Sequence, residues 1–546
     1  MKKYLLLLFL CQSTILHAQY PPFAKLWDIR FGGTLDDIIT GFEQLPDSTF
    51  FLAGSSISGI SGDKTEDNRD TSYNSSDFWI LKAAANGPKL WDKTYGGTGS
   101  EELMDYVRTS DGGYLLGGQT FSGLSGDKTE PNWDPTLASN DYWIVKTDAS
   151  GNKQWDKRFG GTSFDILNSV NQTPDGGYLL AGSSFSGISG DKTQVNQGAW
   201  DYWLVKTNAS GVKQWDRRFG GLEDDFITAS CLTADGGCLI GGYSKSNPGG
   251  DKTQPCQGNW DYWVVKVNSQ GNKVWDKTFG GNYTDWLFDM ILVSDGGFLL
   301  GGQSFSEASG DKSEPNHDAT PAGSDYWMVR IDAAGNKLWD RTFGGSEIED
   351  ISRVVELDDG GFLVSGESYS PADGNKTEPN LGIEQTWVVK TDSAGTFLWD
   401  KTIFTNGHDE LGTAIPSGPD CFVVVNLTMS DSGGYVSENT KGNGDFWMVK
   451  LCNIPNGIDE QQATNDWKIY PNPGSGFIHL VAPESEEVMI TFTDYTGRTI
   501  HRMNQTFSFA GEEITMDVAS FTNGIYLIRI IGADGVVTMK QLVLLK

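Results

Sequence analysis

Trp275-Asp276-Lys277-Thr278-Phe279-Gly280-Gly281 opens a stretch that occurs seven times in this chain with small changes. Each copy continues with Asp-Gly-Gly, then Ser-Gly-Asp-Lys-Thr or a variant of it, then a segment like Asp-Tyr-Trp-Val-Val-Lys. The copies are spaced by 60 to 64 residues, and a fixed period of this size indicates a repeat architecture. The opening Trp-Asp pairs begin at Trp27, Trp91, Trp155, Trp215, Trp275, Trp339 and Trp399.

One unit, from Ser163 to Gly221, predicts four short strands joined by tight turns. Pro174-Asp175-Gly176-Gly177 is a hairpin turn, because glycine permits the positive φ that such turns need. The third strand is apolar on both faces, so its sheet must pack between two similar sheets, as a propeller blade does. The expected strands are 165–173, 178–182, 201–207 and 213–219.

The two ends of the repeat region predict a closed ring. Residues 26–31 have the pattern of a fourth strand with no blade before it, and residues 445–451 form a third strand with no fourth after it. Pairing these two segments would complete the last blade and remove the exposed edges of an open array. We therefore expect an all-β chain in which residues 19–452 form a seven-bladed β-propeller.

Two turns of the repeat resemble those of known propeller families. Thr109-Ser110-Asp111-Gly112-Gly113 resembles the Asp-box of sialidase-like propellers, although Leu116 stands where that motif has an aromatic residue. The spacing from Asp148 to Gly151 and Trp155 resembles the tryptophan-docking repeat of quinoprotein propellers, one residue shorter. Both resemblances concern the building of blades, and neither implies a catalytic residue.

The first 18 residues read as a secretory signal peptide. Lys2 and Lys3 precede the apolar run 4–10, and Leu16-His17-Ala18 resembles a cleavage site that leaves Gln19 first. We prefer simple cleavage to a lipid anchor at Cys11, because Phe9-Leu10 fits a lipoprotein box poorly. No later segment has the ~18 continuous apolar residues that a membrane-spanning helix needs.

Composition limits the partners of the exported chain. The formal net charge is −31, so we expect no binding to nucleic acid, which needs a basic surface. Five cysteines follow the signal peptide, an odd number that leaves at least one unpaired within the chain. Either Cys231–Cys238 or Cys421–Cys452 could form a disulfide, and buried thiols are the alternative for both pairs.

A different pattern begins after Cys452. Residues 453–466 are polar and read as a linker, and short alternating strands with glycine turns in 467–546 predict a small Ig-like β-sandwich. Four motifs there resemble the type A C-terminal sorting domain of the type IX (Por) secretion system. They are Tyr470-Pro471-Asn472-Pro473, Thr496-Gly497-Arg498, Asn523-Gly524-Ile525-Tyr526 and the terminal Lys546.

This resemblance implies a destination and a partner for the chain. The partner is the type IX secretion machinery of a Bacteroidota-type cell. The cargo passes the outer membrane and ends at the cell surface or in the medium. The resemblance implies nothing about what the propeller does there.

One carboxylate recurs in every unit, four residues after the second glycine of Phe-Gly-Gly. Because each carboxylate lies at the start of the innermost strand of its own blade, the seven together would surround the central axis. One interpretation is local, since short acidic side chains often cap turns. The other is a cation site for Ca²⁺, because the negative charge of clustered carboxylates needs compensation. The residues are Asp37, Glu101, Asp165, Asp225, Asp285, Glu349 and Asp409.

Trp133, Trp200 and Trp260 are extra to the repeat and lie in or beside its long loops, and Trp286 follows Asp285. Aromatic rings beside acids and amides are typical of sugar-binding surfaces, so the three loop tryptophans are candidate ligand-binding residues. The alternative is that they pack the loops onto the blades.

Catalysis has little support in the sequence. No two histidines stand at metal-ligand spacing, and no Gly-x-Ser-x-Gly or His-Glu-x-x-His motif occurs. The sequence therefore predicts a surface or secreted binding module for a glycan or another surface ligand, with no catalytic residue assigned. The alternatives are a polysaccharide-active glycosidase or lyase using carboxylates, and a purely structural surface component.

Overall fold

The computed structural model describes residues 23–318, 323–418, 420–453, 467–470, 474, 476–483, 485–494, 498–509, 511–532 and 537–544. These residues form 35 strands and no helix. The chain divides into two compact units, one containing the repeats up to Cys452 and the other containing the C-terminal residues. The predicted signal peptide and the predicted linker, apart from Asn453, lie outside the described residues.

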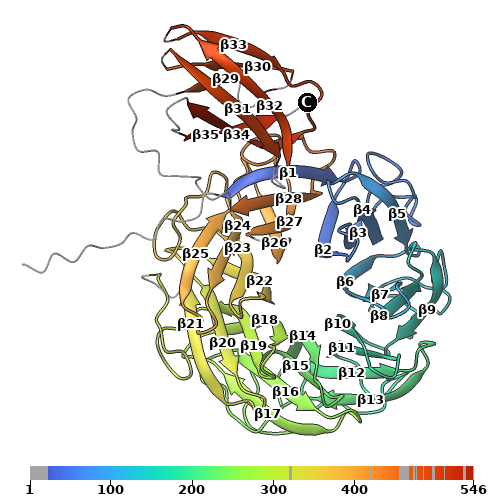
Figure 1. Ribbon diagram of the computed structural model, residues 1–546. Coiled ribbons are helices and arrows are strands. Elements are labelled where there is room, and N and C mark those ends of the chain that lie inside the picture. The colour runs from blue at the N-terminus through green and yellow to red at the C-terminus, as the bar shows by residue number, and fades with distance from the viewer. Residues whose placement is uncertain are drawn as a thin grey trace, which may run out of the picture. The chain divides into compact units, whose positions relative to one another are not determined.

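The repeats form seven antiparallel four-stranded sheets around a common axis, with the first strand of each sheet innermost (Figure 1). The prediction of an all-β propeller is confirmed. Blades 1 to 3 are β2 (Asp37–Gln44), β3 (Phe50–Ser56), β4 (Asp77–Ala83) and β5 (Lys89–Tyr95); β6 (Glu101–Arg108), β7 (Tyr114–Thr120), β8 (Asp141–Thr147) and β9 (Lys153–Phe159); and β10 (Asp165–Gln172), β11 (Tyr178–Ser184), β12 (Asp201–Thr207) and β13 (Lys213–Phe219).

Blades 4 to 6 follow the same plan. They are β14 (Asp225–Leu232), β15 (Cys238–Ser244), β16 (Asp261–Val267) and β17 (Lys273–Phe279); β18 (Asp285–Leu292), β19 (Phe298–Ser304), β20 (Asp325–Ile331) and β21 (Lys337–Phe343); and β22 (Glu349–Glu356), β23 (Phe362–Ser368), β24 (Gln385–Thr391) and β25 (Phe397–Thr402).

Blade 7 is built from both ends of the repeat region. Its sheet has the order β1-β28-β27-β26, so the N-terminal strand lies beside the last strand of the repeats. The Asp28 carboxylate accepts the indole N–H of Trp447 at 3.1 Å, and the Arg30 guanidinium lies 3.2 Å from Asp445. The strands are β26 (Asp409–Pro416), β27 (Cys421–Thr428), β28 (Asp445–Asn453) and β1 (Phe23–Phe31).

Recurring residues of the repeat meet inside each blade. Trp203 is fully buried, and its indole N–H donates to Asp216, the aspartate of the next Trp-Asp pair, at 3.2 Å. Asp216 also accepts the backbone N–H and the hydroxyl of Thr193 from the Asp-Lys-Thr loop, at 2.9 and 2.8 Å. The repeated tryptophan, aspartate and threonine thus connect the third strand, the fourth strand and the long loop through hydrogen bonds to one carboxylate.

One of the two candidate disulfides is present. Cys421 and Cys452 are direct cross-strand partners in β27 and β28, and they are bonded. Cys231 instead faces Leu239, while Cys238 faces Leu232. Because neighbouring strand residues point to opposite faces, that pair does not meet, and Cys231, Cys238 and Cys256 are free thiols.

The C-terminal unit is a small two-sheet β domain. The sheets have the orders β29-β30-β33 and β32-β31-β34-β35, and Ile478, Leu480, Ile490 and Ile528 from both pack into one core. The predicted two-sheet architecture is thus observed. The strands are β29 (Lys468–Tyr470), β30 (Phe477–Val481), β31 (Glu486–Asp494), β32 (Thr499–Phe507), β33 (Glu513–Asp517), β34 (Gly524–Gly532) and β35 (Val537–Leu544).

Candidate functional site

The seven predicted metal ligands, here called the ring carboxylates, are each the first residue of an innermost strand, and all are fully buried. The Asp165 carboxylate accepts the Gly161 N–H at 2.7 Å and the Ser186 hydroxyl at 2.9 Å. The same glycine bond, 2.6 to 2.8 Å long, occurs in blades 1 to 6. In blade 7 the Thr405 hydroxyl bonds Asp409 instead. In blades 1 to 6 these carboxylates therefore cap the glycine turn that leads from the preceding blade into their own.

Burial leaves these carboxylates poorly solvated. It raises the pKa of Asp165 to about 6, although hydrogen bonds from Ser184, Gly161 and Ser186 lower it. Across the blade junction, burial raises the pKa of Asp141 to about 7, with a further contribution from the charge of Asp165. The buried Lys192 ammonium, held by the Ser184 hydroxyl at 2.9 Å, is the nearby positive charge. The lysine of the Asp-Lys-Thr loop therefore balances this buried acidity.

The ring carboxylates do not converge on a common point. Among the described residues, the only set of three or more histidine, cysteine or acidic side chains with ligand atoms within 4.8 Å of one another is Glu384, His408 and Glu410. None of the seven belongs to it. Calcium binding by the ring stays a prediction.

We expect Asp165→Asn to stabilise the propeller at pH 8 and to leave its stability nearly unchanged near pH 4. The carboxyl group has a raised pKa in the folded state, so the stability it contributes is present in acid and is lost as pH rises from about 4 to about 6. Asparagine cannot ionise and can still accept the Gly161 bond. At about 1.4 kcal/mol per pKa unit, the gain at pH 8 is about 1–3 kcal/mol.

Urea unfolding of wild type and variant at both pH values, with and without millimolar Ca²⁺, measures this difference. A variant that is less stable than wild type at pH 8, only when Ca²⁺ is present, would contradict the turn-cap account and favour a bound cation.

The three candidate tryptophans do not share one site. Trp133 is 42% exposed on the loop between β7 and β8. Its indole N–H donates to Asp191 at 2.8 Å, and the Arg158 guanidinium lies 4.6 Å from its ring centroid. Trp133 thus joins its loop to the Asp-Lys-Thr loop of the next blade.

Trp200 and Trp260 lie at blade junctions, each directly before a third strand. The carbonyl groups of Trp200 and Trp260 accept the backbone N–H groups of Asp225 and Asp285, at 2.8 and 2.7 Å. The ring of Trp200 contacts Phe226 on the innermost strand of the following blade, whereas the ring of Trp260 packs against Phe226 and Tyr243 of its own blade. Trp200 lies 5.5 Å from Phe185 and 5.3 Å from Phe226, measured between ring centroids.

Three positions at this end of every blade depart from the repeat. They are the second residue of the innermost strand, its cross-strand partner on the second strand, and the residue before the third strand; we call each set a variable triplet. Around the ring they read Ile38/Ser55/Ser76, Glu102/Gln119/Asn140, Ile166/Ser183/Trp200, Phe226/Tyr243/Trp260, Trp286/Gln303/Ser324, Asp350/Glu367/Glu384 and Glu410/Leu427/Gly444.

Blades 3 to 5 contribute a continuous row of rings, the aromatic sector. Phe226, Tyr243 and Trp260 lie 5.3 to 5.9 Å from one another. Tyr243 lies 5.9 Å from Trp286, which lies 5.9 Å from Phe305. The sector consists of Phe185, Trp200, Phe226, Tyr243, Trp260, Trp286 and Phe305.

Blades 6 and 7 contribute carboxylates in the same positions, and we call Asp350, Glu367, Glu384 and Glu410 the acidic sector. The Ser324 hydroxyl of blade 5 donates to Asp350 at 3.3 Å, so the aromatic and acidic sectors adjoin. This sector was not predicted from the sequence. Comparing the seven units column by column would have found it, because these columns vary while their neighbours repeat.

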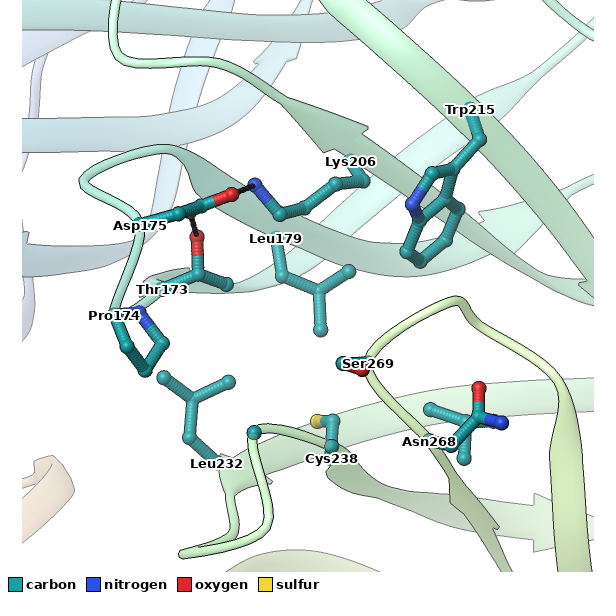
Figure 2. A pocket seen from close by; sticks show the side chains of 13 residues that line it. Thr173, Pro174, Asp175, Leu179, Lys206, Trp215, Leu232, Cys238, Asn268 and Ser269 are labelled. Atoms are coloured by element: carbon teal, nitrogen blue, oxygen red, sulfur yellow. Dashed lines mark hydrogen bonds and ion pairs between the residues drawn. The ribbon is translucent and has the colours of Figure 1, made fainter.

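A small cavity lies at the opposite end of the strands, between the hairpin turns of blades 3 and 4 (Figure 2). Lys206 and Asp175 form an ion pair of 3.0 Å at its edge, and Leu179, Trp215 and Leu232 provide apolar walls. Its volume is about 180 Å³, below the several hundred Å³ typical of pockets for drug-sized ligands. The variable triplets are thus the stronger candidate site.

Residues 468–544 match the family model described as the secretion system C-terminal sorting domain. The prediction of a type IX sorting domain is confirmed, and the protein is exported to the cell surface or the medium by that secretion machinery. The described residues include no helix that is both long and apolar enough to cross a bilayer.

Other similarities are distant. The regulatory protein FlaEY of Caulobacter vibrioides is 27% identical over 236 residues, which cover 41% of this chain and only 24% of FlaEY. Puromycin hydrolase has a TM-score of 0.41 at 12% identity, covering 91% of this chain and 59% of the hydrolase. The Neurospora crassa Pan2 WD40 domain has a TM-score of 0.34 at 11% identity, covering 65% of this chain and 90% of the domain. YCF48 bound to D1 peptide has a TM-score of 0.38 at 6% identity, covering 80% of this chain and 98% of YCF48.

Proposed function

We propose that this exported propeller is a binding module and that its ligand, a glycan, binds over the variable triplets. The observation that carries this proposal is that three adjoining positions at one end of the blade vary between units, although their strand neighbours, such as Asp225 and Gly242, recur. Residues needed only to build a blade have the same task in every copy. Positions that change from apolar to aromatic to acidic around one end of the ring therefore serve something other than the fold.

The aromatic sector supports a sugar as the ligand. Its rings from Trp200 to Trp286 are only partly buried, and flat aromatic faces pack well against the apolar faces of sugar rings. The buried indole N–H of Trp286 has no hydrogen-bond partner among the described residues. Such a donor suits a ligand hydroxyl, because an unpaired buried donor is costly.

A polysaccharide-active enzyme is the second candidate. Burial raises the pKa of Glu367 to about 7. The negative charges of Asp350, Glu410 and Glu384 also raise this pKa, and the hydrogen bond from the Leu411 N–H lowers it. A carboxyl group that holds its proton near neutral pH is suited to general acid catalysis.

A glycan array combined with a product assay on the bound glycans tests the proposal. We expect the mature protein to bind a class of glycans without releasing products. Product formation that stops in Glu367→Gln would favour the enzyme instead. If no glycan binds, the proposal fails, and a structural role at the surface becomes the better account.

A further inference from the structure

The acidic sector gathers negative charge with little positive charge to balance it. Asp350 and Glu367 are cross-strand partners in β22 and β23, and Glu384 directly precedes β24. Among the described residues, no lysine or arginine forms an ion pair with any member of the sector, and His408 is the basic side chain in contact with Glu384 and Glu410.

Two carboxylates of the sector, Glu384 and Glu410, meet the side chain of His408. Glu384 is fully buried and contacts His408 Nδ1 through Oε1, while its Oε2 has no hydrogen-bond partner among the described residues. His408 Nε2 lies 2.6 Å from Glu410 Oε1. The side chains of His408 and Glu410 are 32% and 39% exposed, so the cluster opens to solvent on one side.

We propose that Glu384, His408 and Glu410 bind a divalent transition-metal ion such as Zn²⁺. Their ligand atoms lie within 4.8 Å of one another, a spacing that a single ion can bridge after small side-chain rotations. Imidazole with carboxylates suits Zn²⁺ and its neighbours in the first transition row better than Ca²⁺, which prefers oxygen ligands alone. One nitrogen of the imidazole ring binds the ion together with one oxygen from each of the two carboxylates.

The competing arrangement is a protonated imidazole held between two carboxylates. Burial lowers the pKa of His408, but the hydrogen bonds and charges of Glu384 and Glu410 outweigh it and raise the pKa. In that arrangement the proton compensates part of the charge that the metal would compensate. The metal takes the place of the proton on one ring nitrogen, and this proton passes to solvent. The buried Glu384 Oε2 then gains a partner that the protonated form does not supply.

Equilibrium dialysis of the untagged mature protein against ZnCl₂ tests the site. We expect one Zn²⁺ per chain in excess of any carried by a Glu384→Gln variant, and an affinity reduced about 10–100-fold or more in His408→Gln and Glu410→Gln. Since Glu384 is buried, the two partly exposed variants keep the test decisive if Glu384→Gln folds poorly.

Glu102→Gln is the matched control, because Glu102 occupies the same column in blade 2 as Asp350 and Glu410 in blades 6 and 7. It should bind Zn²⁺ like wild type. Zinc binding that is equal in wild type, His408→Gln and Glu410→Gln, or no stoichiometric binding in wild type, would overturn the proposal. Glycan binding is measured separately, so the two proposals stand or fall independently.

Discussion

Deletion of residues 20–33 is expected to convert the propeller into an aggregating chain without a cooperative melting transition. These residues include β1, which provides the outer strand of blade 7. Its loss exposes the edge of β28, breaks the buried ion pair between Arg30 and Asp445, and removes the Asp28 carboxylate that accepts the indole N–H of Trp447. Breaking a buried ion pair costs about 3–5 kcal/mol, a large part of the about 5–15 kcal/mol that stabilises a typical domain.

Size-exclusion chromatography and thermal melting check this result, and a permuted chain is its control. In blade 3 the third and fourth strands are joined by residues 208–212 alone. Moving residues 23–33 behind residue 453 through a similarly short turn should restore a monomeric, cooperatively melting ring. If the simple deletion remains monomeric with the wild-type Tm, the N-terminal strand does not close the propeller.

Removal of residues 467–546 is expected to stop surface delivery completely and to leave the protein in the periplasm. The sorting-domain match lies within these residues. The C-terminal core is formed between Trp467 and Leu544, and the repeats form their own separate cores, so the truncated propeller should still fold. Fractionation of cells expressing both forms measures the effect. A folded, truncated protein at the cell surface would contradict the assigned role of this domain.

The fold could be predicted from the sequence because each strand is marked by residues that recur. The buried tryptophans such as Trp203 and their aspartate partners such as Asp216 are needed in every blade, so the period shows them directly. The choice between the disulfides could not be made, because it depends on strand register. A shift of one residue separates Cys231 from Cys238, while Cys421 and Cys452 face each other.

The candidate site was harder to predict, for a physical reason. A recurring residue such as Asp165 attracts attention, yet recurrence is what a turn-capping role produces. The candidate binding residues are exceptions to the repeat, and they come together only through strand pairing and blade packing. Trp200 and Trp260 could be recognised as additions to the repeat. Glu367, Glu384 and His408 are separated along the chain and each is an ordinary polar residue by itself, so only a comparison of the seven units position by position distinguishes them.

Exchanging one variable triplet for another tests the central claim most directly. The combined substitutions Phe226→Ile, Tyr243→Ser and Trp260→Ser give blade 4 the residues that blade 1 has at Ile38, Ser55 and Ser76, so the blade already tolerates them elsewhere. Trp133→Ala, which removes an exposed loop tryptophan outside the triplets, is the control.

The measurement is the affinity of both variants for the glycan that binds wild type most tightly on the array. We predict a loss of at least about 100-fold for the exchanged triplet, since three aromatic contacts of about 1 kcal/mol or more each disappear. The Tm should remain near that of wild type, and Trp133→Ala should keep wild-type affinity. Wild-type affinity in the exchanged triplet, or a comparable loss in Trp133→Ala, would contradict the placement of the binding site over the variable triplets.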